Sequence, residues 1–239
     1  MITRLWMFFP VVIMVSCGSG DSDKVKLVPD QEPVVETDPL LEEVEEEEEL
    51  GEIFAIDYDT TLWTDISFIQ EDVILDLRYA TKNNFLGEVL YDCPRCLLRP
   101  EVALALQRVH WDLQEKGMSI KVFDCYRPQF VQKKMWEIKP NPNYVANPQH
   151  GSMHTRGVAV DVTIVNSEGK EINMGTDFDH FGIESHVDYL EHSDEVLDNR
   201  ALLRETMENY GLKGIQTEWW HFSMRGLNYP LDTMRWNCN

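Results

Sequence analysis

Residues 152–161 read Ser-Met-His-Thr-Arg-Gly-Val-Ala-Val-Asp and contain two side chains of metal-binding type, His154 and Asp161. Valines alternate with Ala159 and Asp161 over residues 158–162, a pattern that predicts a buried β-strand. A carboxylate in such a strand costs free energy unless it is paired or binds a metal. Asp161 is therefore a candidate metal ligand.

A second motif follows, in which residues 218–221 read Glu-Trp-Trp-His. His221 supplies a third ligand, and two His with one Asp form a zinc site whose fourth position stays open, as catalytic zinc requires. Glu218 is placed to accept a proton from a water molecule that the metal activates. The two motifs together predict a zinc hydrolase that binds one Zn²⁺ per chain.

The spacing within each motif predicts a local feature of the backbone. Seven residues of extended strand span roughly 23 Å, so the chain must turn between the first two ligands, and Gly157 permits that turn. The aromatic residues around the second motif favour a strand over residues 215–224, in which Glu218 and His221 would point to opposite faces. Both could face one cleft only if the strand is bulged or ends near His221, and we expect a bulge.

The other histidines have a simpler interpretation. A histidine beside polar neighbours is more often a surface or hydrogen-bonded residue than a ligand. We assign five residues to this class: His110, His150, His180, His186 and His192.

Residues 53–239 predict one compact domain. Helices are expected at 100–116, 128–138 and 193–210, and strands at 73–79, 120–125, 158–162 and 215–224. Because the strands and helices do not alternate regularly, we expect an α+β fold with a small, mainly antiparallel sheet flanked by helices.

The first 17 residues predict a targeting segment. Arg4 precedes an apolar run at 5–15, which is too short to span a bilayer as a helix. Residues 16–20 then read Ser-Cys-Gly-Ser-Gly, which resembles a bacterial lipoprotein signal with Cys17 as the lipidated residue. An ordinary secretory signal is the alternative. We expect an exported protein, either periplasmic or anchored in the outer membrane through this lipid.

Residues 18–52 predict an acidic, disordered tether. The stretch from Asp21 to Glu52 has fourteen acidic residues and two lysines, and 45–49 are consecutive glutamates. Such a segment cannot bury enough apolar surface to offset the entropy of ordering. No basic cluster occurs anywhere in the chain, so we expect no nucleic-acid partner.

Four cysteines remain if Cys17 is lipidated, in a compartment that permits disulfides. They allow three pairings, among which the sequence does not choose: Cys93, Cys96, Cys125 and Cys238. A zinc knuckle at Cys93 and Cys96 is an alternative, but it needs two further soft ligands at similar spacing. None is evident, and structural bridges are favoured.

The whole pattern resembles the VanX-type D-alanyl-D-alanine dipeptidases, within the peptidoglycan DD-peptidases that have a hedgehog-like zinc domain. The motifs of that family, S-x-H-x-x-G-x-A-x-D and E-x-W-H, both occur unbroken at 152–161 and 218–221. Residues 124–129, 77–85 and 174–179 are similar to its Y-R-P, Y-A-T…N-F and M-G-x-x-F-D segments, in the same order. The resemblance covers about residues 66–236.

The resemblance implies a role for individual residues. It gives the zinc ligands as His154, Asp161 and His221, the catalytic base as Glu218, and the arginine that stabilises the transition state as Arg127. It places three residues around the dipeptide: Ser152, Tyr79 and Asp179. Asp179 suits the ammonium end because a carboxylate pairs with a cation. For Tyr79, a core tyrosine on a strand is nearly as good an interpretation.

The implied reaction is zinc-dependent hydrolysis of D-Ala-D-Ala to two D-alanines in cell-wall dipeptide turnover. A peptidoglycan carboxypeptidase or endopeptidase with the same zinc site, or a non-catalytic zinc-stabilised binding module, are the alternatives. Glu218 and Arg127 argue against the last, because a structural site needs neither. An exported enzyme would not meet cytoplasmic D-Ala-D-Ala, so we expect it to scavenge dipeptide released from the wall.

Overall fold

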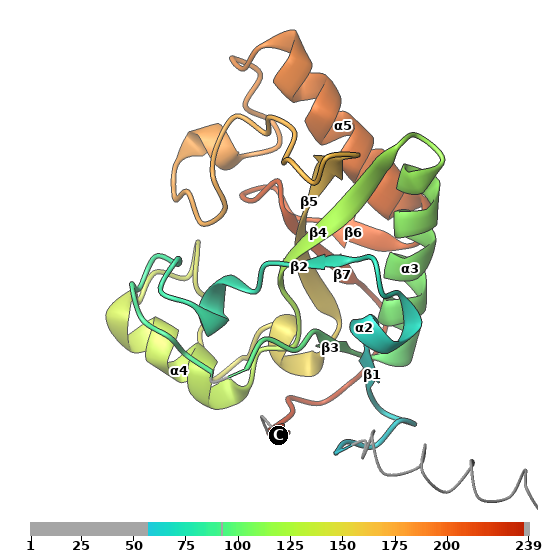
Figure 1. The fold of residues 1–239 in the computed structure, drawn as a ribbon. Helices are drawn as coiled ribbons and strands as arrows, with labels where there is room; N and C mark the ends of the chain where they lie inside the picture. Colours follow the sequence, from blue (N-terminus) through green and yellow to red (C-terminus); the bar gives the residue numbers. More distant parts are fainter. Residues whose placement is uncertain (1–56, 92, 237–239) are drawn as a thin grey trace, which may run out of the picture. The chain divides into compact units, whose positions relative to one another are not determined.

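A computed structural model of the protein describes residues 57–91 and 93–236 (Figure 1). The predicted signal peptide, Cys17 and the predicted acidic tether lie outside the described residues. In the part that is described, no helix has the length and apolar character needed to cross a membrane.

The main sheet has five strands in the order β2-β4-β5-β7-β6. Their bounds are Ile74–Leu75 for β2, Met118–Asp124 for β4, Ala159–Asn166 for β5, Leu212–Gly214 for β6 and His221–Met224 for β7. Only β2 and β4 are parallel, and the other pairs are antiparallel. A second, two-stranded sheet joins β1 (Thr64–Asp65) to β3 (Leu97–Leu98). This confirms the expected α+β fold with a mainly antiparallel sheet.

Helices cover the sheet in the places that the apolar pattern predicts. α3 (Pro100–Gln114) packs on β4, α5 (Asp194–Asn209) packs on β6, and the two helices contact each other. Figure 1 shows α4 (Gln129–Ile138) away from this pair, and a short α2 (Ile66–Ile69) beside α3. The apolar face of α3 is buried as expected, with Val102, Ala105, Leu106, Val109 and Leu113 all in the core.

Strand β5 is the middle strand of the five-stranded sheet. Its first seven residues are all buried, because β4 and β7 pair with its two edges and side chains cover both faces. Asp161 lies on this strand, so its carboxylate is positioned by one of the most constrained parts of the backbone.

Two strand predictions were wrong in part. The strand expected at 73–79 has only two paired residues, and the chain then forms a 3₁₀ turn, η2 (Arg78–Ala80), that contains Tyr79. The side-chain amide of Asn84 donates to the carbonyl oxygens of Arg78, Thr81 and Glu88, which stabilises this turn over an extended strand. Tyr79 is buried, but it does not lie on a strand.

The strand expected at 215–224 begins only at His221. Gly214 of β6 pairs with Phe222 of β7, so residues 215–220 form the connection between these two antiparallel strands. They lie outside the β6–β7 ladder, and a bulge of that ladder cannot occur there. Glu218 lies in this connection, and the bulge expected between Glu218 and His221 is absent from it. A register shift occurs instead in β4, between Val122 and Asp124.

Candidate active site

Three predicted ligands lie at one point in the core. Each of His154, Asp161 and His221 offers one ligand atom, and these atoms lie within 4.8 Å of one another. Asp161 Oδ1 is 2.9 Å from His221 Nδ1 and 3.2 Å from His154 Nε2. All three residues are buried, so two imidazole nitrogens and one carboxylate oxygen face each other out of bulk water.

The local folds explain this convergence. Asp161 and His221 are direct partners across the β5–β7 pairing, whereas His154 starts the 3₁₀ turn η3 (His154–Arg156) that precedes β5. Gly157 ends this turn with φ 74°, which confirms the turn predicted there. A Cβ at this position would lie 2.4 Å from the ring of Trp63, so both the conformation and the space require glycine.

The donor set fits a divalent metal ion. Burial raises the pKa of Asp161, but the charge and hydrogen bonds of His154 and His221 outweigh this effect and hold the pKa well below its usual range. An ionised carboxylate and two imidazoles suit zinc, and three protein ligands leave a coordination position for water or substrate. The described residues contain no second group of three such ligands.

Glu218 lies beside this group. Its Oε2 atom is 4.0 Å from His221 Nδ1, although the two residues occupy a connection and a strand. Burial raises the pKa of Glu218 to about 7, and the negative charges of Asp161 and Asp179 act in the same direction. A carboxylate with a pKa near neutrality can both take up and release a proton at neutral pH.

Arg127 approaches the group from the end of β4. Its Nε and Nη2 atoms donate to Asp124 Oδ2 over 2.9 and 2.6 Å, and Nη1 donates to Gln132 Oε1 over 3.1 Å. Burial lowers the pKa of Arg127, but the charges of Asp124 and Asp161 outweigh burial and raise it above its usual range. The guanidinium is therefore a fixed positive charge, and Nη2 lies 3.8 Å from Asp161 Oδ2.

Asp124 and Gln132 support Arg127, and the sequence pattern did not single them out. Asp124 is fully buried and also accepts a hydrogen bond from the hydroxyl of Tyr91 over 2.9 Å. Gln132 donates to the carbonyl oxygen of Ala146 over 2.7 Å, which links Arg127 to the loop at 140–148. Only the position of Asp124 could have identified it from the sequence as a partner of Arg127, since it lies three residues before Arg127 at the end of a buried strand.

Asp179 and Tyr79 also line the site, and the Arg127 guanidinium lies over the Tyr79 ring. The hydroxyl of Tyr79 donates to Asp179, with Oδ1 and Oδ2 at 3.1 and 3.0 Å. Burial, followed by the charge of Asp161, raises the pKa of Asp179 to about 8. Asp179 has φ 60° and is the one described non-glycine residue with a positive φ. Such backbone conformations cost free energy and are frequent where ligands bind.

Ser152 completes the set. Its Oγ accepts a hydrogen bond from the backbone N–H of His154 over 3.2 Å. One cavity of about 240 Å³ is lined by all eight residues that the sequence predicted around the chemistry: Tyr79, Arg127, Ser152, His154, Asp161, Asp179, Glu218 and His221.

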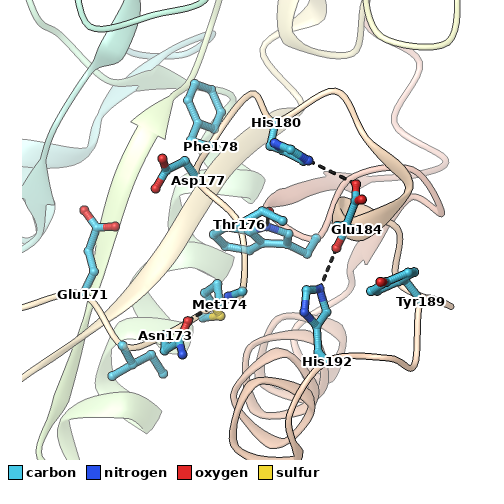
Figure 2. A pocket seen from close by; sticks show the side chains of 13 residues that line it. Glu171, Asn173, Met174, Thr176, Asp177, Phe178, His180, Glu184, Tyr189 and His192 are labelled. Atoms are coloured by element: carbon cyan, nitrogen blue, oxygen red, sulfur yellow. Dashed lines mark hydrogen bonds and ion pairs between the residues drawn. The ribbon is translucent and has the colours of Figure 1, made fainter.

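A larger cavity, of about 670 Å³, lies elsewhere and contains none of these eight residues (Figure 2). His180 and His192 line it, and Figure 2 shows both in contact with Glu184. His180 Nε2 is 3.2 Å from the Glu184 carboxylate, and His192 Nε2 is 2.7 Å from the Glu184 carbonyl oxygen. These two histidines are hydrogen-bonded, as expected, and this cavity has no metal-binding trio among the described residues.

The cysteine bonds are settled for the described part of the chain. Cys96 is disulfide-bonded to Cys125, and Cys93 is disulfide-bonded as well. A zinc knuckle at Cys93 and Cys96 is therefore excluded, and the predicted structural bridges are confirmed for these three residues.

Comparison with known proteins gives a consistent result. A family model described as D-Ala-D-Ala dipeptidase, peptidase M15, matches residues 59–237. The D-alanyl-D-alanine dipeptidase of Escherichia coli (strain K12) is 35% identical over 181 residues, which cover 75% of this chain and 94% of that protein. The D-alanyl-D-alanine dipeptidase of Enterococcus faecium is 30% identical over 195 residues, with 70% and 94% covered.

Solved structures show a weaker likeness. The LD-carboxypeptidase LdcB matches with a TM-score of 0.41 and 16% identity, covering 70% of each chain. The vancomycin resistance D,D-pentapeptidase VanY, solved with Zn(II), matches with a TM-score of 0.35 and 17% identity, covering 66% of this chain and 82% of that one.

Proposed function

This chain belongs to the D-Ala-D-Ala dipeptidase family, peptidase M15, and we propose from its site that it hydrolyses D-Ala-D-Ala to two molecules of D-alanine with one Zn²⁺ per chain. The observation that carries the proposal is one cavity in which the metal-binding trio meets Glu218, Arg127 and Asp179.

His154, Asp161 and His221 hold the zinc ion. When bound, zinc acts as a Lewis acid and makes water nucleophilic near neutral pH. The positive charge of the ion also favours ionised Glu218, so this carboxylate is ready to act as a base.

Glu218 moves the proton. It accepts a proton from the attacking water and delivers it to the departing amine nitrogen as the C–N bond breaks. Its position beside His221, in a connection rather than on a strand, places the carboxylate next to the ligands without making it one of them.

Arg127 stabilises the negative charge that develops on the carbonyl oxygen. Its bonds to Asp124 and Gln132 use three of its five N–H groups, so two remain for a substrate oxygen. Because the guanidinium is held in place before substrate arrives, little reorganisation is needed when the charge forms.

Asp179 binds the ammonium group of the dipeptide, and Tyr79 and Ser152 orient the ligand. A partly buried carboxylate whose pKa is raised to about 8 gains most from a cation that arrives with the substrate. The hydroxyl of Tyr79 keeps the Asp179 carboxylate in one orientation.

The size of the cavity favours a dipeptide over the carboxypeptidase or endopeptidase alternative. Its volume of about 240 Å³ lies below the ~300–1,000 Å³ of sites for larger ligands. Three aromatic rings from separate loops pack together at its edge, with Phe181 centred 5.0 Å from Phe85 and 4.8 Å from Tyr144. Lys139 Nζ lies 4.0 Å from the Phe181 ring and adds a cation–π contact.

The test is a comparison of three substrates with the purified zinc protein. We expect release of D-alanine from D-Ala-D-Ala, and little or none from a pentapeptide ending in D-Ala-D-Ala or from intact sacculi. Faster release from the longer substrates would assign the carboxypeptidase or endopeptidase activity instead.

Export and lipidation at Cys17 belong to the same proposal, and the motif at residues 16–20 supports them. The lipid would anchor the enzyme at a membrane, and residues 18–52 would hold the domain away from it. Labelling with a fatty-acid analogue in a bacterial host should mark the wild type and not Cys17→Ser. An unlabelled wild type, or equal labelling of both proteins, would remove lipidation at Cys17 from the proposal.

A further inference from the structure

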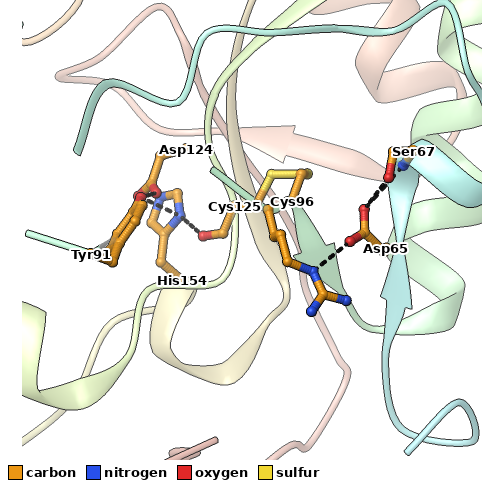
Figure 3. Close-up of a disulfide and its surroundings, with 8 residues drawn as sticks. Asp65, Ser67, Tyr91, Cys96, Asp124, Cys125 and His154 are labelled. Carbon is orange, nitrogen blue, oxygen red and sulfur yellow. Dashed lines mark hydrogen bonds and ion pairs between the residues drawn. A yellow bond between two sulfur atoms is a disulfide. The ribbon is translucent and has the colours of Figure 1, made fainter. Parts of the chain in front are cut away.

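The Cys96–Cys125 disulfide reaches the proposed metal site through one backbone atom. The carbonyl oxygen of Cys125 lies 2.8 Å from His154 Nδ1 (Figure 3). A carbonyl oxygen can only accept, so this contact places the imidazole proton on Nδ1. Nε2, which faces Asp161 and His221, is then left with its lone pair for the metal.

The five-stranded sheet does not hold this carbonyl in place, and its peptide unit is held instead by the bond of the Tyr126 N–H to β3 and by the disulfide. Cys125 follows the last residue of β4, immediately after the register shift between Val122 and Asp124. A bulge interrupts the ladder and lets the strand bend away from its partner. The backbone bonds that follow are Tyr126 N–H to Leu97 O, 3.0 Å, and Arg127 N–H to His154 O, 3.2 Å.

The disulfide fixes Cys125 from the other side. Cys96 is fully buried, and its own carbonyl oxygen accepts a hydrogen bond from the Ile66 backbone N–H over 3.0 Å. The next residue, Leu97, is paired in the two-stranded sheet. The covalent bond therefore joins a bulged strand end to an anchored strand at the position where the carbonyl must point at His154.

A competing partner for Nδ1 is close by. Asp124 Oδ2 lies 3.4 Å from His154 Nδ1, farther than the Cys125 carbonyl, and Arg127 already uses this oxygen. If Cys125 moves away, the imidazole can turn toward the carboxylate, and Nε2 then leaves the point where the other two ligands meet.

We propose that the Cys96–Cys125 disulfide is a positioning element of the zinc site, which sets the orientation of the His154 ring through the Cys125 carbonyl. The inference rests on the proposed function, in which His154 binds zinc. Partners of this kind typically change metal affinity by about 10–100-fold when they are lost.

The experiment measures zinc affinity at equilibrium, by competition with a chromophoric chelator, in C96A/C125A. The matched control is C93A/C238A, which removes the two other cysteines of residues 53–239 and leaves the Cys96–Cys125 bond intact. We expect the zinc dissociation constant to rise about 10–100-fold in C96A/C125A and to stay within about twofold of wild type in the control. Equal losses in both variants, or no loss in either, would overturn the inference.

A second measurement covers the case in which C96A/C125A does not fold. In C93A/C238A, a phosphine reductant opens the remaining bond in the folded, metal-free protein. The His154 Nδ1–H signal in ¹⁵N-edited NMR should then broaden through exchange with water, and an unchanged signal would contradict the proposal. A His154→Ala variant that binds zinc as tightly as wild type would instead contradict the proposed function. The failure of the inference and the failure of the proposed function are therefore distinguishable.

Discussion

Asp161 and His221 stand directly opposite each other in the β5–β7 pairing, with Oδ1 and Nδ1 2.9 Å apart. Two of the three proposed ligands are thus positioned by backbone hydrogen bonds of the central sheet. The third, His154, depends on a turn and on the Cys125 carbonyl. The site therefore combines a rigid pair with one ligand whose orientation is set from outside the sheet.

Glu218→Gln removes the proposed base and keeps the shape of the side chain. We expect zinc content to remain at wild-type level while kcat falls by about 10²–10⁴-fold, because only proton transfer is lost. Glu184→Gln, in the separate larger cavity, serves as the matched control and should stay within about twofold of wild type. Measuring kcat and bound zinc on the same samples decides the point; a Glu218→Gln enzyme with normal turnover would remove Glu218 from the mechanism.

Arg127→Lys keeps the charge but loses the fork that bonds to Asp124 and Gln132 together. Since the proposed interaction forms in the transition state, kcat should fall about 10²–10³-fold with a smaller change in KM. Steady-state kinetics on D-Ala-D-Ala gives both values. A raised KM with unchanged kcat would mean that Arg127 only holds the substrate.

Asp179→Asn tests the binding of the ammonium group. The variant should raise KM for D-Ala-D-Ala more than it lowers kcat, because ground-state pairing with the cation is lost. N-acetyl-D-Ala-D-Ala has no ammonium group and should be a poor substrate for wild type and Asp179→Asn alike. If the variant lowers the rate equally on both substrates, Asp179 has another role.

The same substitution has a pH-dependent effect on stability. The folded protein raises the pKa of Asp179 to about 8 from 3.8, so between these values the folded state binds a proton that the unfolded state has lost. Stability from this group is therefore full below pH ~4 and declines as pH rises toward 8. Metal-free Asp179→Asn should be more stable than metal-free wild type at pH 8, by about 1 kcal/mol or more, and the difference should shrink at pH 5. Urea unfolding at both pH values measures it; a difference independent of pH would contradict the burial of a charged carboxylate.

The sequence predicted those parts of the fold that depend on local patterns. The apolar stripe of α3, the buried run of β5 and the turn at Gly157 all follow from periodicity and from the conformational freedom of glycine. Short strands such as β1 and β3 were missed, because two paired residues carry no periodic signal and their partners lie far away in the sequence.

The residues around the chemistry were predicted mainly through the resemblance to a known family, and the structure brings all eight into one cavity. The contacts that support them were not predictable. The bond from Arg127 to Asp124 forms where β4 ends, just after a register shift, and the position of Glu218 depends on where β6 and β7 begin to pair. Such features are decided by tertiary packing, which leaves no local trace in the sequence.

Zinc reconstitution tests the central claim most directly. Protein stripped by exhaustive chelation should be inactive on D-Ala-D-Ala and should regain activity in proportion to added Zn²⁺, up to one equivalent per chain. His154→Ala should neither bind this equivalent nor recover. A protein that stays fully active after chelation, or a His154→Ala variant that recovers like wild type, would contradict the account.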